Sequence, residues 1–345
     1  MCTGFRLKAE NGSVVYARTM EWGAFDLNSQ VTLIPKGHVF QGTTPEGANG
    51  KEWAAKYNVL ALDILGTDWL ADGVNEAGLA VGVFYHPGFA EYPDYDPVEQ
   101  KNTIAAVEMA GYLLTRYASI QEVKEGLKGI QAIGVGEAIL GTPDPAHWMV
   151  TDASGASIVI EYAHGEVQVF DNPLGVITNA PTYDWHMINL RNYVNLSSVA
   201  LPTRHVDELD FAPLGAGSGM IGLPGDNTPP SRFVRAVAMT HTTRPIPNAH
   251  EAVYEALRIL DNFNLPLGGA EGSDQDGDTT AMRSSTIWTS VWDVEKRTLY
   301  YHTQHNRRVR KVSLADVTFA EGALKRIPLD REKEQDVEDV SALLA

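Results

Sequence analysis

Residues Met1–Trp22 read MCTGFRLKAENGSVVYARTMEW, and their order predicts a β-hairpin. Strand-forming residues flank Asn11-Gly12, the dipeptide that two-residue type I′ hairpin turns prefer. With this turn at the centre, Cys2 faces Glu21, and the returning strand carries Arg18 back toward the N-terminus. Because side chains alternate between the two faces of a strand, Arg18 and Glu21 would lie on opposite faces. We therefore expect a β-bulge or bend between them, which would let both side chains reach Cys2.

Cys2 is the only cysteine of the chain and directly follows Met1. If Met1 is removed, a thiol and a free α-amine belong to one residue, and an amine with a pKa of about 8 can accept the thiol proton. Against this, chain termini are usually idle, and a lone cysteine is usually a small buried apolar residue. An active thiol also needs a cation and an acceptor nearby. Arg18 and Glu21 fit these roles, although alone they would form a solvated surface pair.

The composition is that of a globular protein, with 345 residues, 44% hydrophobic and 21% charged, and a formal net charge of −17. The negative charge opposes nonspecific binding to nucleic acid and to anionic membranes. A single cysteine excludes an internal disulfide, and no apolar run is long enough to span a bilayer. No signal peptide is visible, which predicts a cytoplasmic protein; a chain trimmed just before Cys2 would be periplasmic or secreted.

Strand and helix patterns follow along the chain. Strands are expected at 57–62, 69–71, 78–85, 147–151, 157–161, 166–170, 285–292 and 297–302, with a turn at 72–77. Helices are expected at 103–117, after Ser119, at 231–239 and at 249–260, with capping boxes at Ser119 and Asn248. This order predicts an α+β fold of two packed antiparallel sheets with helices outside. We expect a single domain over 1–325 with a loop-rich excursion at 189–230, then an acidic C-terminal helix or tail over 326–345.

Several sequence blocks are shared with a known family and extend to about Thr303. They are Met1-Cys2-Thr3, Ala17–Trp22, Asp72–Val81 (DGVNEAGLAV), Val176–Trp185 (VITNAPTYDW), Asn189–Tyr193 (NLRNY), Gly222–Asp226 (GLPGD) and Ser231–Arg235 (SRFVR). Each block alone is weakly specific, but together and in this order they are highly specific. The chain resembles the choloylglycine hydrolase family of N-terminal-nucleophile (Ntn) amidases, which holds bile salt hydrolases and penicillin V acylases.

The resemblance implies a four-layer αββα sandwich, the Ntn-hydrolase fold, and a homotetramer formed through a loop like that at 189–226. It implies Cys2 as the nucleophile, with Arg18 beside the thiol and Arg232 completing the polar cluster. It also implies two donors to the oxyanion, which are the side-chain amide of Asn179 and the backbone N–H of Tyr85.

No cofactor or metal is expected. The histidines lack zinc-binding spacing, and no dinucleotide fingerprint or P-loop is present. The acidic run Asp274–Asp278 resembles a calcium loop, but its glycine is misplaced and the glutamate at the twelfth position is absent.

Two positions depart from the pattern of the family. Glu21 stands where the family usually has aspartate, and one extra methylene can shift the carboxylate by about 1 Å, which can cost ~100-fold in rate. Tyr85 stands where bile salt hydrolases usually have asparagine, and an aromatic residue there is similar to the penicillin V acylases. Trp22 and Phe84 add aromatic surface that suits a phenoxyacetyl or other acyl group. As ordinary core residues they would need no such role.

We therefore expect an enzyme that hydrolyses linear amides of N-acyl compounds through a thioester, with penicillin V-type substrates. Conjugated bile salts and N-acyl homoserine lactones are alternative substrates. Two other possibilities stay open: transfer of the acyl group to an amine, and an inactive relative, marked by Glu21, that only binds acylated small molecules.

Overall fold

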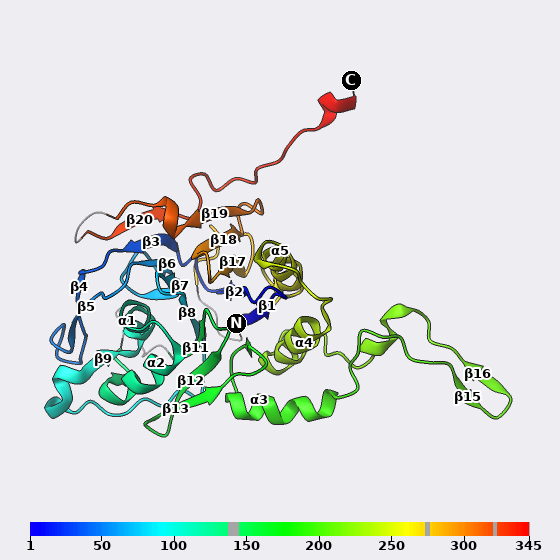
Figure 1. The fold of residues 1–345 in the computed structure, drawn as a ribbon, viewed down its shortest axis with the longest axis horizontal. Helices are drawn as coiled ribbons and strands as arrows, with labels where there is room; N and C mark the ends of the chain where they lie inside the picture. The colour runs from blue at the N-terminus through cyan, green and yellow to red at the C-terminus, as the bar shows by residue number, and fades with distance from the viewer. Residues whose placement is uncertain (137–144, 273–276, 320–322, 345) are drawn as a thin grey trace.

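The computed structural model describes residues 1–136, 145–272, 277–319 and 323–344, which form two large antiparallel sheets (Figure 1). In spatial order, the first sheet contains β14 (Val176–Ile177), β1 (Cys2–Lys8), β2 (Val14–Glu21), β17 (Thr286–Asp293), β18 (Thr298–Thr303) and β19 (Arg310–Ser313). The second contains β13 (Glu166–Asp171), β12 (Ser157–Ala163), β11 (Ala146–Asp152), β8 (Leu79–Tyr85), β7 (Leu70–Asn75), β6 (Val59–Asp63), β3 (Gln30–Ile34) and β20 (Lys325–Pro328). Short pairs also form between β4 (Val39–Gln41) and β5 (Glu52–Ala54), and between β9 (Thr103–Ala105) and β10 (Gln131–Ile133).

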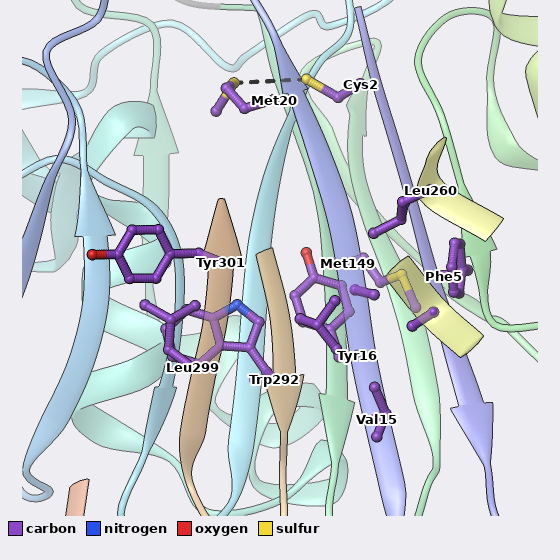
Figure 2. Packing of buried hydrophobic residues seen from close by; sticks show 14 of the residues in the cluster. Cys2, Phe5, Val15, Tyr16, Met20, Met149, Leu260, Trp292, Leu299 and Tyr301 are labelled. Atoms are coloured by element: carbon purple, nitrogen blue, oxygen red, sulfur yellow. Dashed lines mark hydrogen bonds between the residues drawn. The ribbon is translucent and has the colours of Figure 1, made fainter. Parts of the chain in front are cut away.

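Helices cover the outer face of each sheet. α1 (Met109–Arg116) lies against β7 and β8, and α2 (Ile120–Gly126) lies against β11. On the other side, α4 (Pro229–Thr242) covers β1 and β14, while α5 (Ala249–Leu260) covers β2 and β17. Figure 2 shows part of the apolar core of the first sheet, including Phe5, Tyr16 and Trp292. The predicted four-layer αββα architecture is confirmed.

The predicted register of the first hairpin is wrong by one residue. Cys2 pairs with Met20, and Phe5 pairs with Ala17. The connection has three residues, because the N–H of Ala9 donates to the C=O of Ser13 at 2.9 Å. Gly12 has a φ of 88°, which suits the left-handed position of a three-residue loop with a G1 bulge. Asn11-Gly12 predicts the hairpin, but the loop type sets its register.

The expected bulge is present at the right level but on another strand. β2 runs without interruption from Val14 to Glu21 along β1. On its other side, Thr286 of β17 pairs with Glu21 and Trp288 pairs with Met20, so one extra residue is accommodated in β17. The irregularity therefore places Thr286 opposite Glu21. It does not bring Arg18 and Glu21 to the same face of β2, as the sequence predicted.

Two other predicted elements differ. The turn expected at 72–77 is mostly strand β7, because Asp72 is buried between the sheets and accepts a hydrogen bond from Trp292 Nε1 at 2.7 Å. The helix expected at 103–117 begins as β9 and becomes α-helical only at Met109. By contrast, the β11–β12–β13 meander and the β17–β18 hairpin form as predicted, and Ser119 and Asn248 cap α2 and α5.

Three segments leave the layered body or define its end. Strand β20 pairs with β3, so the paired structure continues past 325, and Asp330 Oδ1 accepts a hydrogen bond from Arg310 Nη1 at 2.6 Å. The described residues after Asp330 are exposed; Lys333 and Asp336 still pair with Asp26 and Arg308, and the segment beyond them extends away from the layers (Figure 1). After α3 (Tyr183–Asn189), an arm over 190–228 projects from the body and carries the small hairpin of β15 (Arg204–Val206) and β16 (Leu209–Phe211). None of the helices in the described ranges is long and apolar enough to cross a membrane.

Candidate active site

Cys2 is the first residue of β1 and lines a cavity. Its side chain is buried at 3% exposure, and its Sγ contacts Met20 Sδ at 3.8 Å (Figure 2). The backbone N of Cys2 donates to Asn179 Oδ1 at 2.8 Å. Met1 precedes it, and the N-terminal amine donates to the C=O of Glu21 at 3.0 Å. Removal of Met1 would leave the Cys2 nitrogen as an amine already oriented by the Asn179 side chain.

Arg18 supplies a buried cation beside this thiol. Its Nη1 donates to the C=O of Ala71 at 3.0 Å, and its Nη2 contacts Met20 Sδ at 3.7 Å. The sulfur of Met20 therefore lies between the guanidinium and Cys2. Burial acts to lower the pKa of Arg18, but Cys2 and nearby acidic groups outweigh it and hold that pKa above its ordinary value. Arg18 thus stays charged and electrostatically coupled to Cys2.

Glu21 is buried at 3% exposure at the end of β2. Thr286 Oγ1 donates to Oε1 at 3.1 Å, whereas Oε2 has no hydrogen-bond partner among the described residues. Burial raises the pKa of Glu21, while the terminal amine and Arg232 act to lower it. The β17 irregularity therefore places the hydroxyl of Thr286 at the level of the longer glutamate side chain.

Asn179 and Arg232 form the hub of the polar cluster. Asn179 follows β14, and Arg232 lies in the second turn of α4. Arg232 Nη2 donates to Asn179 Oδ1 at 2.6 Å, and Nη1 donates to the C=O of Cys2 and to Thr3 Oγ1. Burial lowers the pKa of Arg232 to about 10, so it is still a cation at neutral pH. The single oxygen Asn179 Oδ1 is thereby held by both Cys2 and Arg232.

Tyr85 ends β8 next to Asn179. The C=O of Tyr85 accepts a hydrogen bond from Asn179 Nδ2 at 2.6 Å. Tyr85 faces Ala146 across the ladder, while the next residue, His86, donates its N–H to Pro145. Because bonded and non-bonded positions alternate in antiparallel pairs, the N–H and C=O of Tyr85 both point away from β11 and toward the side of Asn179. An amide nitrogen carries two N–H groups, so Asn179 retains a second N–H for a substrate oxygen.

Two cavities meet at this cluster. An inner apolar cavity of about 70 Å³ is lined by Cys2, Glu21 and the rings of Trp22, Phe25, Trp69 and Tyr85. An outer cavity of about 470 Å³ shares Glu21, Trp22 and Tyr85 and also contains Met1, Asn179 and Glu271 in its wall. Trp22 makes edge-to-face contacts with Phe25 and Tyr85, both at 5.8 Å between ring centroids. Phe84 is instead fully buried, with Arg18 over its ring at 4.3 Å.

Comparison with models of known protein families identifies the family of this chain. Residues 2–331 match the model for linear amide C–N hydrolases of the choloylglycine hydrolase family. The chain belongs to the choloylglycine hydrolase family. It is therefore an enzyme of the class that hydrolyses linear amides, and its fold is that of an Ntn-hydrolase, as the sequence predicted.

Relatives of this choloylglycine hydrolase family member cover nearly the whole chain. A bile salt hydrolase/transferase of Clostridium perfringens is 33% identical over 91% of this chain and 92% of the relative. A penicillin V acylase of Pectobacterium atrosepticum is 28% identical over 89% of this chain and 78% of the relative. Among solved structures, a mutant of conjugated bile acid hydrolase from C. perfringens matches with a TM-score of 0.83 at 30% identity, covering 99% and 100% of the two chains. Penicillin V acylase from Agrobacterium tumefaciens matches with a TM-score of 0.75 at 25% identity, covering 95% and 92%.

Sequence reasoning missed several residues around the site. Met20 contacts Cys2 and Thr286 contacts Glu21, and the positions of both depend on the register that was predicted incorrectly.

Sequence reasoning also missed a buried cluster of His86, His147 and Glu161, whose potential ligand atoms lie within 4.8 Å of one another. The rings of His86 and His147 are stacked at 4.1 Å and 18°, so their planes cannot both contain one ion without a large rotation. The cluster as arranged does not suit a metal. Part of the acidic run Asp274–Asp278 lies outside the described residues.

Buried histidines should make the fold sensitive to acid. Burial lowers the pKa of His86 to about 3 and those of His186 and His302 to about 4. Below about pH 6.5 the unfolded chain binds protons that the folded histidines reject, so the free energy of unfolding should fall by roughly 2 kcal/mol per histidine between pH 6.5 and 4.5. Burial also raises the pKa of Asp72, to about 6, and those of four other carboxyl groups, all of which oppose this slope, while His147, whose pKa is lowered to about 3, adds to it. Urea unfolding at both pH values measures the change, and equal midpoints would contradict it.

Proposed function

We propose that Cys2, released by removal of Met1, is the nucleophile of an amidase acting on small N-acyl compounds. The free amine of Cys2 accepts the thiol proton, and the sulfur attacks the acyl carbonyl carbon. Asn179 Nδ2 and the N–H of Tyr85 stabilise the oxyanion. The proton passes to the amine product as the C–N bond breaks, leaving a thioester that water hydrolyses to a carboxylic acid and the free thiol. The observation that carries this proposal is the convergence of Cys2 N and Arg232 Nη2 on the side-chain oxygen of Asn179.

Electrostatics in the buried cluster support these roles. Arg18 holds a positive charge close to the Cys2 sulfur, with Met20 Sδ between the two groups. Once Met1 is removed, the Cys2 amine gains further N–H groups, and we propose that Glu21 Oε2 accepts a hydrogen bond from one of them, since Thr286 Oγ1 donates to Oε1. Arg232 stays charged and fixes the orientation of the Asn179 amide. These contacts pre-organise the site before substrate binds.

The dimensions of the two cavities favour a compact acyl group. The inner cavity is narrow and aromatic, and edge-to-face rings such as Trp22 and Tyr85 suit a flat ring or a short apolar chain. The outer cavity is larger and bears polar groups, so it suits the amine part of the substrate. We therefore favour phenoxyacetyl amides such as penicillin V, with N-acyl homoserine lactones as a related possibility.

A second candidate function is the hydrolysis of glycine- or taurine-conjugated bile salts, or transfer of their acyl group to another amine. It is favoured by the 33% identity with the C. perfringens bile salt hydrolase/transferase. A rigid steroid would require the inner cavity to widen. A binding-only protein is the remaining alternative, but the complete polar cluster around Cys2 argues against it.

Release of the amine from a panel of substrates distinguishes these functions. The panel holds penicillin V, conjugated bile salts and acyl homoserine lactones, with Cys2→Ala as the control. Fastest turnover of penicillin V would support the compact-acyl proposal, and fastest turnover of bile salts would replace it. Product analysis with a competing amine separates transfer from hydrolysis. Saturable binding without turnover would support the binding-only alternative.

We also propose that the arm over 190–228 assembles the chain into a homotetramer. The arm exposes Val199, Leu209, Phe211, Leu214 and Ile221 at 58% or more of their surface. Exposed apolar groups gathered on one projecting segment indicate a protein interface. Replacing Leu209 and Phe211 together by glutamate should therefore dissociate the assembly, as measured by sedimentation equilibrium. Val98→Glu, at an equally exposed apolar residue elsewhere, should leave the mass unchanged. A monomeric wild-type chain would refute the proposal.

A further inference from the structure

Buried histidines hold the backbone on both sides of Asn179. His147 Nε2 lies 3.2 Å from the C=O of Thr178, and His186 Nε2 lies 2.9 Å from the C=O of Asn179. Both histidines are at most 2% exposed. A carbonyl oxygen only accepts, so each of these two nitrogens must carry the proton. Hydrogen bonds from two buried imidazoles thus hold the two carbonyls that flank the Cα of Asn179.

The contact on the far side of His147 requires one more proton. Its Nδ1 lies 3.0 Å from Glu161 Oε1, and the carboxylate also accepts the N–H of Tyr183 at 3.0 Å. A neutral imidazole has only one N–H, which the C=O of Thr178 already takes. The second hydrogen bond therefore needs either a protonated carboxyl on Glu161 or an imidazolium on His147. In both forms, the pair holds two protons rather than one.

Surrounding charges decide between the two forms. Burial lowers the pKa of His147 to about 3, and the nearby Arg18 acts in the same direction. Burial raises the pKa of Glu161, and Asp184 adds to this, while His86, Tyr183 and His186 act against it. The favoured form is a neutral His147 that accepts a hydrogen bond from a protonated Glu161. The apparent titration belongs to the pair rather than to either residue.

The same cluster reaches the other oxyanion donor. His86 follows Tyr85 directly, and its ring stacks on that of His147 at 4.1 Å. The two donors, Tyr85 and Asn179, therefore share one buried support. Thr178 extends it to the start of α4, since its Oγ1 donates to the C=O of Pro229 at 3.1 Å.

We propose that His147 and His186 are positioning residues for the Asn179 oxyanion donor, and that Glu161 and His147 share an extra proton that keeps this support intact. This inference rests on the proposed role of Asn179. Loss of the shared proton leaves two acceptors facing each other, which should loosen the 178–179 backbone. An error of about 1 Å at the oxyanion can cost ~100-fold in rate.

Variants of the pair test the proposal on the full chain. His147→Phe keeps a ring but removes both nitrogens, and we expect kcat to fall about 10- to 100-fold with KM changed less than threefold. Glu161→Gln can donate to His147 and accept from Tyr183 without titrating, so it should retain kcat at pH 7 and remove a fall in kcat at alkaline pH. Glu161→Leu should behave like His147→Phe. His302→Phe, at a buried histidine of β18 outside the site, is the matched control.

Alkylation of the sole cysteine by iodoacetamide separates positioning from general damage. It should change much less than kcat in His147→Phe, because Cys2 Sγ contacts Met20 Sδ and not the side-chain amide nitrogen of Asn179. The proposal is overturned if His147→Phe leaves kcat unchanged, or if it lowers kcat and the alkylation rate in parallel. It is also overturned if Glu161→Gln is as impaired as Glu161→Leu. If His147→Phe does not fold, the pH profiles of wild type and Glu161→Gln decide, and identical profiles overturn it. If Asn179→Ala itself retains kcat, the proposed role of Asn179 fails first.

Discussion

Replacement of Cys2 by alanine should reduce amide hydrolysis by at least ~10⁴-fold, the scale expected when a covalent nucleophile is removed. The substitution deletes one buried sulfur and leaves the Asn179–Arg232 hub in place, so the fold should remain stable. Turnover of the preferred substrate and the urea midpoint measure the two effects. Residual activity within tenfold of wild type would show that another group attacks the carbonyl.

A chain that retains one extra residue before Cys2 distinguishes the role of the thiol from the role of the α-amine. The sulfur and Arg18 are unchanged, but the nitrogen of Cys2 is an amide and cannot accept a proton. We expect the thiol to be alkylated and turnover to be absent, with intact mass confirming the extension. Full activity in this chain would refute the role of the amine, while leaving that of the sulfur.

Local sequence patterns predicted the layers better than they predicted the contacts at the site. The alternation of strands and the caps at Ser119 and Asn248 are local, and they formed as expected. The first hairpin shows the limit of this approach. Asn11-Gly12 fits both two- and three-residue loops, and the choice shifts every pairing by one residue. As a result, Met20 rather than Glu21 faces Cys2, and the partner of Glu21 is Thr286, which is distant in sequence.

Residues brought together from distant segments could be proposed only through the family resemblance. Asn179 and Arg232 meet Cys2 from loops and helices about 180 and 230 positions away, and no spacing rule connects them. The role of Glu21 was uncertain because its length departs from the family. The bulge in β17 places the Thr286 hydroxyl 3.1 Å from Glu21 Oε1, at the level of the longer side chain. The histidine support was missed because isolated histidines in apolar strands carry no spacing signal.

Substitution of Asn179 should affect catalysis more than stability. Asn179→Ala removes the proposed oxyanion donor, and loss of one such donor typically costs about 10²- to 10³-fold in kcat. It also leaves Arg232 Nη2 without its acceptor, so some loss of stability is expected as well. Asn179→Asp keeps the acceptor for Arg232 and Cys2 but replaces the donor by a negative oxygen. This variant should therefore be at least as slow as the alanine variant while unfolding at a urea concentration closer to wild type.

Asn172→Ala provides the matched control for this comparison. Asn172 is also buried and also bonds the backbone near β14, through Val176, but it does not contact Cys2 or Tyr85. Its loss should lower the urea midpoint with little change in kcat. If all three variants lost activity in proportion to stability, the Asn179 amide would serve only the fold. A fall in kcat confined to the Asn179 variants, with alkylation of Cys2 preserved, would place the defect in the oxyanion step.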